Sequence, residues 1–268
     1  MIANARMYSV NAATEAAWRE LLAWVAARAD FDCEVIDYPA PQPLPELWAR
    51  ADLGCAFMCG YPLSQSNPQP VVLAAPVPSP ERYEARPVYW TDLVVRDDSS
   101  IVQPVDALGR RMAYTTPGSQ SGYQAPRHFF ARYASFDRKS LFSDLVGPLI
   151  TPRRVVTAIV DGDADIGPVD SYALDLLRLH EPALVARLRI VASTPPTPIP
   201  PLVAAPTIAP PIGARLTAAL LAVGAASALQ AVRRTLLLRG FVAADTKTYD
   251  LLAQQAADTD RTGYVHLQ

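Results

Sequence analysis

Cysteine is scarce in this sequence, with Cys33, Cys55 and Cys59 as the 3 cysteines among 268 residues. An odd number without a CxxC pair argues against a disulfide framework and against a zinc site. Cys55 and Cys59 flank an apolar run at positions 56–58, which predicts a buried strand. A buried cysteine there is expected to act as a small hydrophobic residue.

Histidine and catalytic motifs are also sparse. The 3 histidines, His128, His180 and His266, lie in no nucleophile or metal signature. The sequence has no GxSxG, no Walker loop, no GxGxxG and no HExxH. It therefore offers no catalytic residue, no cofactor and no metal, and we expect a protein that is not an enzyme.

Neither an excess of positive charge nor a long apolar run is present. Lys and Arg total 24 against 26 Asp and Glu, a net charge of -2, which argues against nucleic acid as a partner. The longest apolar candidate, residues 216–229, is shorter than the ~20 residues that span a bilayer. The first residues lack a basic region followed by an apolar core, so no signal peptide is visible. Either the chain is cytoplasmic or a leader lies outside the sequence given.

Apolar residues make up 50% of the chain and charged residues only 19%, which suits a packed interior. The length fits two compact lobes. In the first third, strand-like and helix-like segments alternate: a strand at residues 7–10, then a helix capped by Asn11 or Thr14. This alternation predicts an α/β fold in which mostly parallel sheets are flanked by helices.

Two stretches predict crossings between the lobes. Residues 87–95 form a long β-type stretch, and residues 194–211 hold eight prolines, which favour a stiff extended connection. We therefore assign residues 1–90 plus 196–268 to lobe 1 and residues 91–195 to lobe 2, with residues 215–255 expected to be helical. Two crossings form a hinge, and a ligand is expected in the cleft that the hinge closes.

The segment Ser119-Gln120-Ser121-Gly122, called the anion segment below, follows an apparent strand at residues 112–115 and precedes an amphipathic helix. Backbone N–H groups, the helix dipole and serine hydroxyls at such a place favour an anion. The alternative is that a serine here is an ordinary N-cap. Pro126 would fall in the second turn of a helix capped by Ser121, where it would kink that helix.

Asp170 and Ser171 follow a predicted strand at residues 166–169, within an acidic stretch whose spacing does not match an EF-hand. Strand ends face the ligand in open α/β sheets, so Asp170 is a candidate ligand contact. The alternative is that Asp170 only caps the next helix. Tyr61 and Tyr89 are further candidates, since tyrosine places a donor on a rigid apolar body, although most tyrosines are packing residues.

In these segments the chain resembles the phosphate/phosphite/phosphonate type of ABC-transporter substrate-binding protein, which has a type 2 periplasmic-binding fold. The resemblance spans nearly the whole chain and rests on stretches in a fixed order: residues 7–8, 57–62, 89–95, 106–113, 119–123, 161–171 and 194–201. It implies that a serine-rich helix start, a tyrosine from each lobe and an aspartate bind an oxyanion head group. The predicted ligand-binding residues are Tyr8, Tyr61, Tyr89, Thr91, Ser119, Gln120, Ser121, Gly122, Tyr123, Thr151, Asp170 and Ser171.

The resemblance implies a monomeric solute-binding protein that captures phosphate, phosphonate or a similar small anion for an ABC-transporter membrane component in the periplasm. A cofactor-biosynthesis-type enzyme and a ligand-sensing domain are the alternatives on the same fold. One stretch departs from the family pattern. Where relatives often have Gly-Ser-His, this chain has Leu149-Ile150-Thr151-Pro152, so that a threonine hydroxyl stands in place of a histidine.

Overall fold

The computed structural model describes residues 1–135 and 140–268 and divides into two compact units. Unit 1 comprises Met1–Val88 and Pro198–Tyr249, and unit 2 comprises Tyr89–Thr197 and Asp250–Gln268. The chain therefore passes between the units at 88/89, 197/198 and 249/250. The sequence placed the first two passages at 90/91 and 195/196 and did not predict the third. Strands β5 (Val88–Tyr89) and β11 (Thr197–Pro198), which contain the first two passages, pair with each other.

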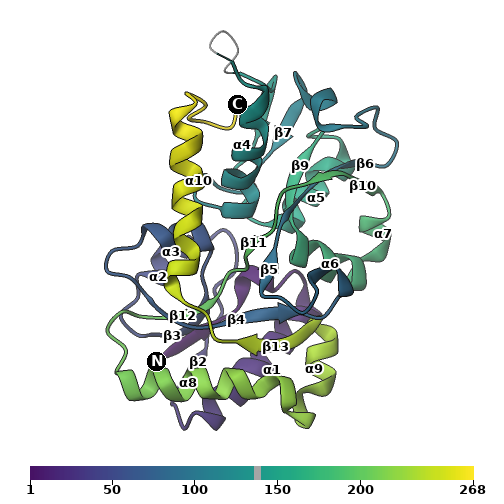
Figure 1. Ribbon diagram of the computed structural model, residues 1–268. Helices are drawn as coiled ribbons and strands as arrows, with labels where there is room; N and C mark the ends of the chain where they lie inside the picture. The colour runs from purple at the N-terminus through teal and green to yellow at the C-terminus, as the bar shows by residue number, and fades with distance from the viewer. Residues whose placement is uncertain (136–139) are drawn as a thin grey trace. The chain divides into compact units, whose positions relative to one another are not determined.

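Unit 1 is built on a six-stranded sheet in the order β13-β4-β12-β3-β1-β2 (Figure 1). Strand β1 lies parallel to β2 and β3, whereas β12 is antiparallel to β3 and β4, and β13 is antiparallel to β4. Four strands thus run in one direction. The strand bounds are β1 Ile2–Asn4, β2 Glu34–Val35, β3 Leu53–Phe57, β4 Val71–Pro78, β12 Leu202–Ala204 and β13 Leu238–Val242.

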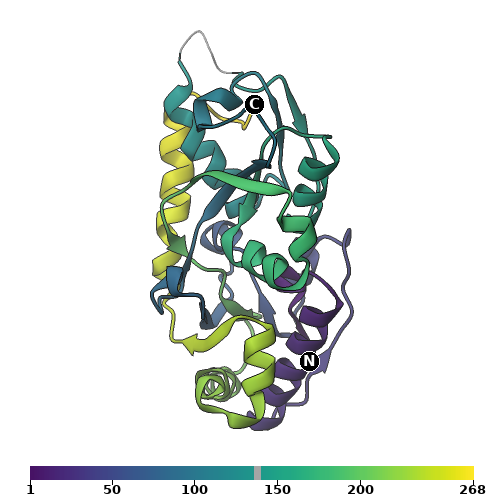
Figure 2. The ribbon, with the colours of Figure 1, turned by 90° about the vertical axis from the view of Figure 1, so that its right-hand side faces the viewer.

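Helices α1, α8 and α9 pack together in unit 1, as Figure 2 shows with α8 seen end-on. Helix α1 begins at a capping box in which Asn11 Oδ1 accepts from Thr14 N at 3.0 Å and Thr14 Oγ1 accepts from Asn11 N at 3.1 Å. The α-helices are α1 Ala12–Arg28, α2 Leu44–Trp48, α3 Gly60–Gln65, α8 Pro210–Ala222 and α9 Gln230–Thr235. Single 3₁₀ turns are η1 Arg6–Tyr8, η2 Glu81–Tyr83, η6 Val223–Ala225, η7 Ser227–Leu229 and η8 Thr246–Tyr249.

Two local predictions for unit 1 were wrong. Residues 7–10 are not a strand: β1 lies earlier, and a 3₁₀ turn follows it because Ser9 and Tyr8 turn their amides back to Arg6 and Ala5. Residues 215–255 are not continuously helical, since β13 interrupts them and completes the sheet edge beside β4. An alternating apolar pattern in β13 is too short to outweigh the helical composition around it.

In unit 2, β6 pairs antiparallel with both β9 and β10, and β7 lies parallel to β8. A parallel bridge from Met112 to Ile166 connects β7 to the start of β9. Four of these strands run in one direction, and only β6, the strand that enters from the first passage, runs against them. The bounds are β6 Thr91–Arg96, β7 Arg111–Ala113, β8 Asp144–Val146, β9 Gly167–Asp170 and β10 Leu188–Ser193.

The helices of unit 2 are α4 Ala125–Phe130, α5 Pro152–Asp161, α6 Ser171–His180, α7 Pro182–Val185 and α10 Asp250–Arg261. Shorter turns are the 3₁₀ helices η3 Pro104–Ala107 and η5 Ala131–Tyr133 and the π-helical turn η4 Gln120–Gln124. Among the described residues no single helix is long and apolar enough to cross a membrane. One pair bent by 70°, Pro210–Ala225 with Ser227–Thr235, meets the length and composition criteria.

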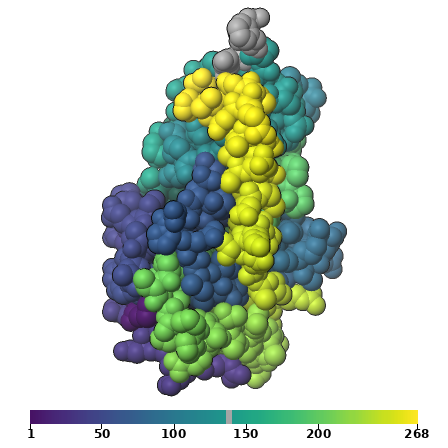
Figure 3. All heavy atoms as spheres, turned by 60° about the vertical axis from the view of Figure 1, so that its left-hand side comes forward, coloured from purple at the N-terminus to yellow at the C-terminus, as the bar shows by residue number. Residues whose placement is uncertain are grey.

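The C-terminal segment Asp250–Gln268 belongs to unit 2, whereas the sequence assigned it to lobe 1. The physical reason is burial. Tyr264 and Leu267 are buried in the hydrophobic core that contains Tyr123 and Phe130. Helix α10 also packs against α4, while its other side forms part of the molecular surface (Figure 3). This pairing joins segments more than a hundred residues apart, so no local pattern could reveal it.

An ion pair at the amino ends of β7 and β9 makes the stability of the protein pH-dependent. The carboxylate of Asp165 accepts three hydrogen bonds from Arg111: from Nε at 3.2 Å, from Nη2 at 2.8 Å and from the backbone N at 2.9 Å. These contacts with Arg111 lower the pKa of Asp165. A carboxyl with a lowered pKa stabilises the folded state above its unfolded pKa, and that contribution is lost as the pH falls through the folded pKa.

We therefore expect Asp165→Asn to lower the free energy of unfolding at pH 7 by about 1 kcal/mol. The difference from the wild type should shrink at pH 3, because the stabilisation begins to be lost once the pH falls below the ordinary pKa of the carboxyl in the unfolded chain. Urea denaturation at both pH values measures this. Asp163→Asn is the matched control, since Asp163 is exposed and should change neither value. An equal loss at pH 3 and pH 7 would contradict the assignment.

Candidate functional site

The carboxyl ends of β7, β8 and β9 lie at one edge of unit 2, and a helix start follows each of them. After β7 comes η4 with Ser119 as its N-cap, after β8 comes α5 with Thr151 as its N-cap, and after β9 comes α6 with Asp170 as its N-cap. Helix starts expose backbone N–H groups and the positive ends of the peptide dipoles. Such an edge favours a negatively charged ligand.

The anion segment is a π-helical turn that runs directly into α4. Ser119 Oγ accepts from Gly122 N at 3.0 Å, Gln124 N donates to Ser119 O at 3.0 Å, and Ala125 N donates to Gln120 O. Pro126 follows directly on the π-helical turn, so the helical run that starts at Gln120 is irregular just before the proline rather than a regular α-helix. Ser119 is a true cap, as the alternative interpretation held, and Ser121 is not the cap.

Backbone and hydroxyl contacts join the anion segment to its neighbours. Thr91 Oγ1 donates to Ser121 O at 3.0 Å, and Thr115 N donates to Gly122 O at 3.3 Å. Ile150 N in turn donates to Thr115 O at 3.1 Å, which brings the start of α5 to the same edge. The structure thus brings together the predicted residues Thr91, Ser119, Gln120, Ser121, Gly122, Tyr123 and Thr151.

Asp170 and Ser171 occupy the end of β9 and the start of α6. Asp170 Oδ1 accepts from Tyr172 N at 2.9 Å and from Ala173 N at 3.0 Å, and it therefore caps α6. Ser171 Oγ accepts from Trp90 N at 3.1 Å. Burial, and then the charges of Asp170 and Asp175, raise the pKa of Tyr172 well above its ordinary value. Contact of Asp170 and Ser171 with a ligand stays a prediction.

Three tyrosines of the predicted site differ in their surroundings. Tyr8, in unit 1, is buried with its ring edge-to-face against Phe57 at a centroid distance of 5.0 Å. Tyr61, also in unit 1, lies half-buried in α3, directly after β3. Tyr89 is buried and belongs to unit 2. Tyr8 and Tyr61 follow strands β1 and β3, so both lie at the carboxyl edge of the sheet in unit 1.

Thr115 is a residue of this edge that the set of predicted ligand contacts left out. Its side chain is 4% exposed, and its Oγ1 has no hydrogen-bond partner among the described residues. A buried hydroxyl without a partner is costly, so Thr115 joins the candidate contacts. The available signal was its position as the last residue of the predicted strand at residues 112–115, just before the anion segment. Among the contacts predicted in unit 2, Asp170 is the one acidic residue and none is basic. Attraction for an anion at this edge therefore rests on backbone dipoles and hydroxyls.

No group of three or more His, Cys, Asp or Glu side chains within residues 1–135 and 140–268 could hold a metal ion. Burial raises the pKa of the Cys33 thiol to about 11 and that of Cys55 further still. Both are therefore thiols rather than thiolates at neutral pH, which disfavours reactivity and metal ligation.

Two α/β units with polar helix starts at the strand ends define the class of type 2 periplasmic-binding folds, and solved structures with this fold match nearly the whole chain. The chain belongs to the family described as "ABC transporter, phosphonate, periplasmic substrate-binding protein", which its sequence matches over residues 8–249. The resemblance seen in the sequence is thereby confirmed. Among curated proteins, none matches the sequence.

Three solved structures illustrate the similarity. A binding protein component of an ABC phosphonate transporter from Pseudomonas aeruginosa has a TM-score of 0.82 at 18% identity, covering 98% of this chain and 87% of its own. PhnD1 from Prochlorococcus marinus in complex with methylphosphonate has a TM-score of 0.78 at 14% identity, covering 97% and 98%. XAC2383 from Xanthomonas citri bound to ATP has a TM-score of 0.68 at 18% identity, covering 100% and 99%. At these identities the likeness shows the fold.

Gly122 allows the anion segment to approach the strand end, and this predicts the effect of a single methyl group. A Cβ at position 122 would lie 1.9 Å from Thr115 Oγ1 and 2.9 Å from Thr115 Cβ. We expect Gly122→Ala to lower the free energy of unfolding by about 1–3 kcal/mol, the usual range for overpacking. Thermal or urea unfolding of the purified protein measures the loss.

Gly118→Ala is the matched control, because a Cβ there would meet nothing within 4 Å. The double variant Gly122→Ala/Thr115→Gly should recover part of the loss, since it removes the clashing side chain. A Gly122→Ala protein as stable as Gly118→Ala would contradict the close approach of the two segments.

Proposed function

We propose that this protein captures a small tetrahedral oxyanion, phosphate or a phosphonate, with the helix-start edge of unit 2 as the site of its head group. The observation that carries the proposal is the meeting of three helix starts, after β7, β8 and β9, at one sheet edge. A tetrahedral head group has several oxygens and can accept from donors that converge from different directions. Membership of the phosphonate-binding family supports the same class of ligand.

The proposed contacts in unit 2 are the side chains and amides of the anion segment together with Thr91, Thr115, Tyr123, Thr151, Asp170 and Ser171. The proposed contacts from unit 1 are Tyr8 and Tyr61, and Tyr89 lies beside the first passage between the units. With the family histidine replaced by Thr151, the ligand meets a neutral hydroxyl at that position. The site then attracts its ligand without a cationic side chain among these contacts.

The proposed partners follow from the family. The protein acts as a monomer, delivers its ligand to the membrane component of an ABC transporter and performs no chemistry of its own. A periplasmic place of action is in keeping with the family description. The competing function, an enzyme on the same fold, would need an acid or base acting on the ligand. Asp170 is the candidate for that role, and in the structure its carboxylate already caps α6.

Ligand binding is tested by thermal shift and by native mass spectrometry of the purified protein. A ligand that binds only the folded state and is present at a hundredfold its Kd stabilises that state by about 2.7 kcal/mol, or roughly 5–10 °C in Tm. We expect such a shift with methylphosphonate or inorganic phosphate, and a retained mass that matches one of them. Conversion of the ligand during incubation would favour the enzyme, and no shift with either anion would contradict the proposal.

The double variant Ser119→Ala/Ser121→Ala tests the site. A hydrogen bond to a charged group contributes about 1.5–3 kcal/mol, so removal of two hydroxyls should weaken anion binding at least tenfold by calorimetry. Because Ser119 also caps η4, the single variant Ser121→Ala separates ligand contact from capping. Ser79→Ala, exposed in unit 1, is the control and should bind like the wild type. Unchanged affinity in the double variant rules out the site.

A further inference from the structure

Arg127 is a buried arginine on α4 whose bonds reach the C-terminal segment. Its side chain is 3% exposed, and one terminal nitrogen donates to Asp260 Oδ1 at 2.5 Å, to Tyr264 O at 3.1 Å and to Val265 O at 2.8 Å. The other terminal nitrogen donates to Ala256 O at 3.2 Å. These carbonyls belong to the last turns of α10 and the residues after it, where a cation is favourable. Removal of Arg127 would leave several buried acceptors without a donor.

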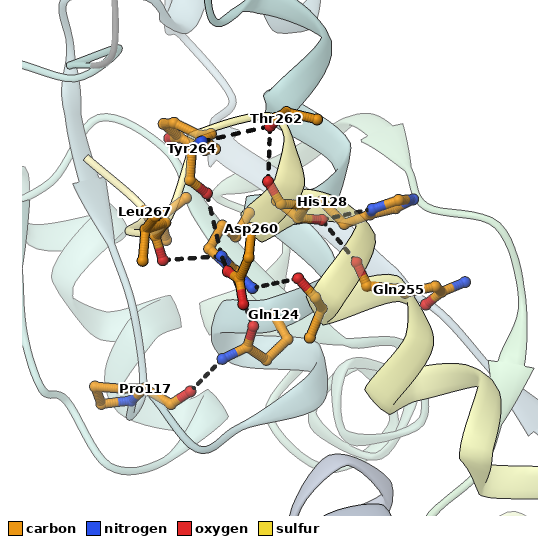
Figure 4. Close-up of polar contacts among 12 residues, drawn as sticks. Pro117, Gln124, His128, Gln255, Asp260, Thr262, Tyr264 and Leu267 are labelled. Atoms are coloured by element: carbon orange, nitrogen blue, oxygen red, sulfur yellow. Dashed lines mark hydrogen bonds and ion pairs between the residues drawn. The ribbon is translucent and has the colours of Figure 1, made fainter.

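Gln124 extends this network to the anion segment. Its Oε1 accepts from Arg127 Nε at 3.1 Å, and its Nε2 donates to Pro117 O at 2.8 Å. Pro117 precedes the anion segment and Gln124 follows it, so the side-chain amide bridges both ends of the segment. Figure 4 shows Gln124 between Pro117 on one side and the contacts near Asp260 on the other. Because Arg127 Nε donates to the amide oxygen of Gln124, the amide nitrogen faces Pro117 O and donates to it.

The anion segment needs such support because its backbone is unusual. A π-helical turn is rare, and its i→i+5 bonds are seldom stable without help from surrounding structure. The C-terminal segment supplies a second contact at the same place: Leu267 N donates to Tyr123 Oη at 3.1 Å. Two successive residues of this turn are therefore held by hydrogen bonds: Tyr123 by Leu267 and Gln124 by Arg127.

We propose that Arg127 is a positioning residue for the ligand: with Gln124 as the bridge and the C-terminal segment as the anchor, it orders the anion segment before the ligand arrives. The proposal rests on the proposed function of that segment. Arg127 is buried, bonds through all three guanidinium nitrogens to protein acceptors and has Asp260 beside it, so it acts through Gln124 rather than by contact with the anion. Order established beforehand reduces the entropy lost on binding.

The C-terminal segment acquires a role from this arrangement. It follows the third passage of the chain between the units, at 249/250, and ends in the core of unit 2 behind the anion segment. The residues of this segment that bond to Arg127 and Tyr123 lie far from the anion segment in sequence. Their effect on affinity is expected to pass through the bridge at Gln124, which is the link to test.

Gln124→Met is the decisive variant, because Met has a similar size and makes neither of the two hydrogen bonds. Arg127→Lys is its companion, since lysine keeps the charge and lacks the planar set of donors. The matched control is Thr259→Val, which removes another bond between α10 and α4, that of Thr259 Oγ1 with His128 Nδ1 at 2.8 Å. This control touches neither Gln124 nor the anion segment.

Two measurements are made on each full-length protein. Calorimetry with methylphosphonate and with inorganic phosphate gives Kd, and hydrogen exchange without ligand gives the protection of the amides of Gly122, Gln124 and Ala125. For Gln124→Met we expect binding about tenfold weaker and faster exchange at these amides. The reason is that the variant loses the net contribution of about one hydrogen bond to the ordering of the segment. Arg127→Lys should change both in the same direction. Thr259→Val should lower Tm and leave Kd unchanged.

The outcomes separate the two proposals. If the wild type binds neither anion, the proposed function fails, and the exchange of the three amides still decides whether Arg127 and Gln124 order the segment. If the wild type binds and Gln124→Met keeps its Kd, the positioning role is overturned, whether exchange changes or not. An equal loss of affinity in Thr259→Val also overturns it, because the effect would then follow stability alone. Should Arg127→Lys fail to fold, Gln124→Met decides.

Discussion

The helix starts of unit 2 carry backbone N–H groups that need hydrogen-bond acceptors. Helix starts after β7, β8 and β9 bring such groups to one sheet edge, where Ser119, Thr151 and Asp170 act as caps. Backbone N–H groups at such helix starts favour negative charge at the same place. The family membership of the chain and the geometry of the edge thus point to the same class of ligand, a small anion.

At this edge the anion segment adopts a π-helical turn, a conformation that rarely forms without support from the surrounding structure. In η4 most residues of the anion segment are buried, and Gly122 lets the turn lie against Thr115 where a larger residue would collide. Three residues outside the turn hold it by hydrogen bonds. Thr91 from β6 bonds to Ser121 O, Arg127 bonds to Gln124, and Leu267 from the C-terminal segment bonds to Tyr123. Thr91 is thus both a proposed ligand contact and a support of the turn, whereas Arg127 and Leu267 only support it.

Local chemistry made part of the site predictable. Small polar residues directly after a strand mark helix starts, so the anion segment, Thr151 and Asp170 could be found from their positions alone, and the structure places all three at helix N-caps or in the first turn. Thr115 was not among the predicted contacts because a threonine at a strand end is usually satisfied by its neighbours. Arg127 went unnoticed because its partners in the C-terminal segment lie up to 138 positions away, and the bridging role of Gln124 depends on Arg127.

The sequence by itself determined two α/β units, from composition and alternating segments, because periodicity and capping are local properties of the chain. The solute-binding class came from the resemblance of an ordered series of stretches to that family. Only the tertiary structure decided where the C-terminal segment belongs, which strands run against the majority, and what supports the anion segment. These depend on burial of Tyr264 and Leu267 and on pairing between distant segments, which no local pattern encodes.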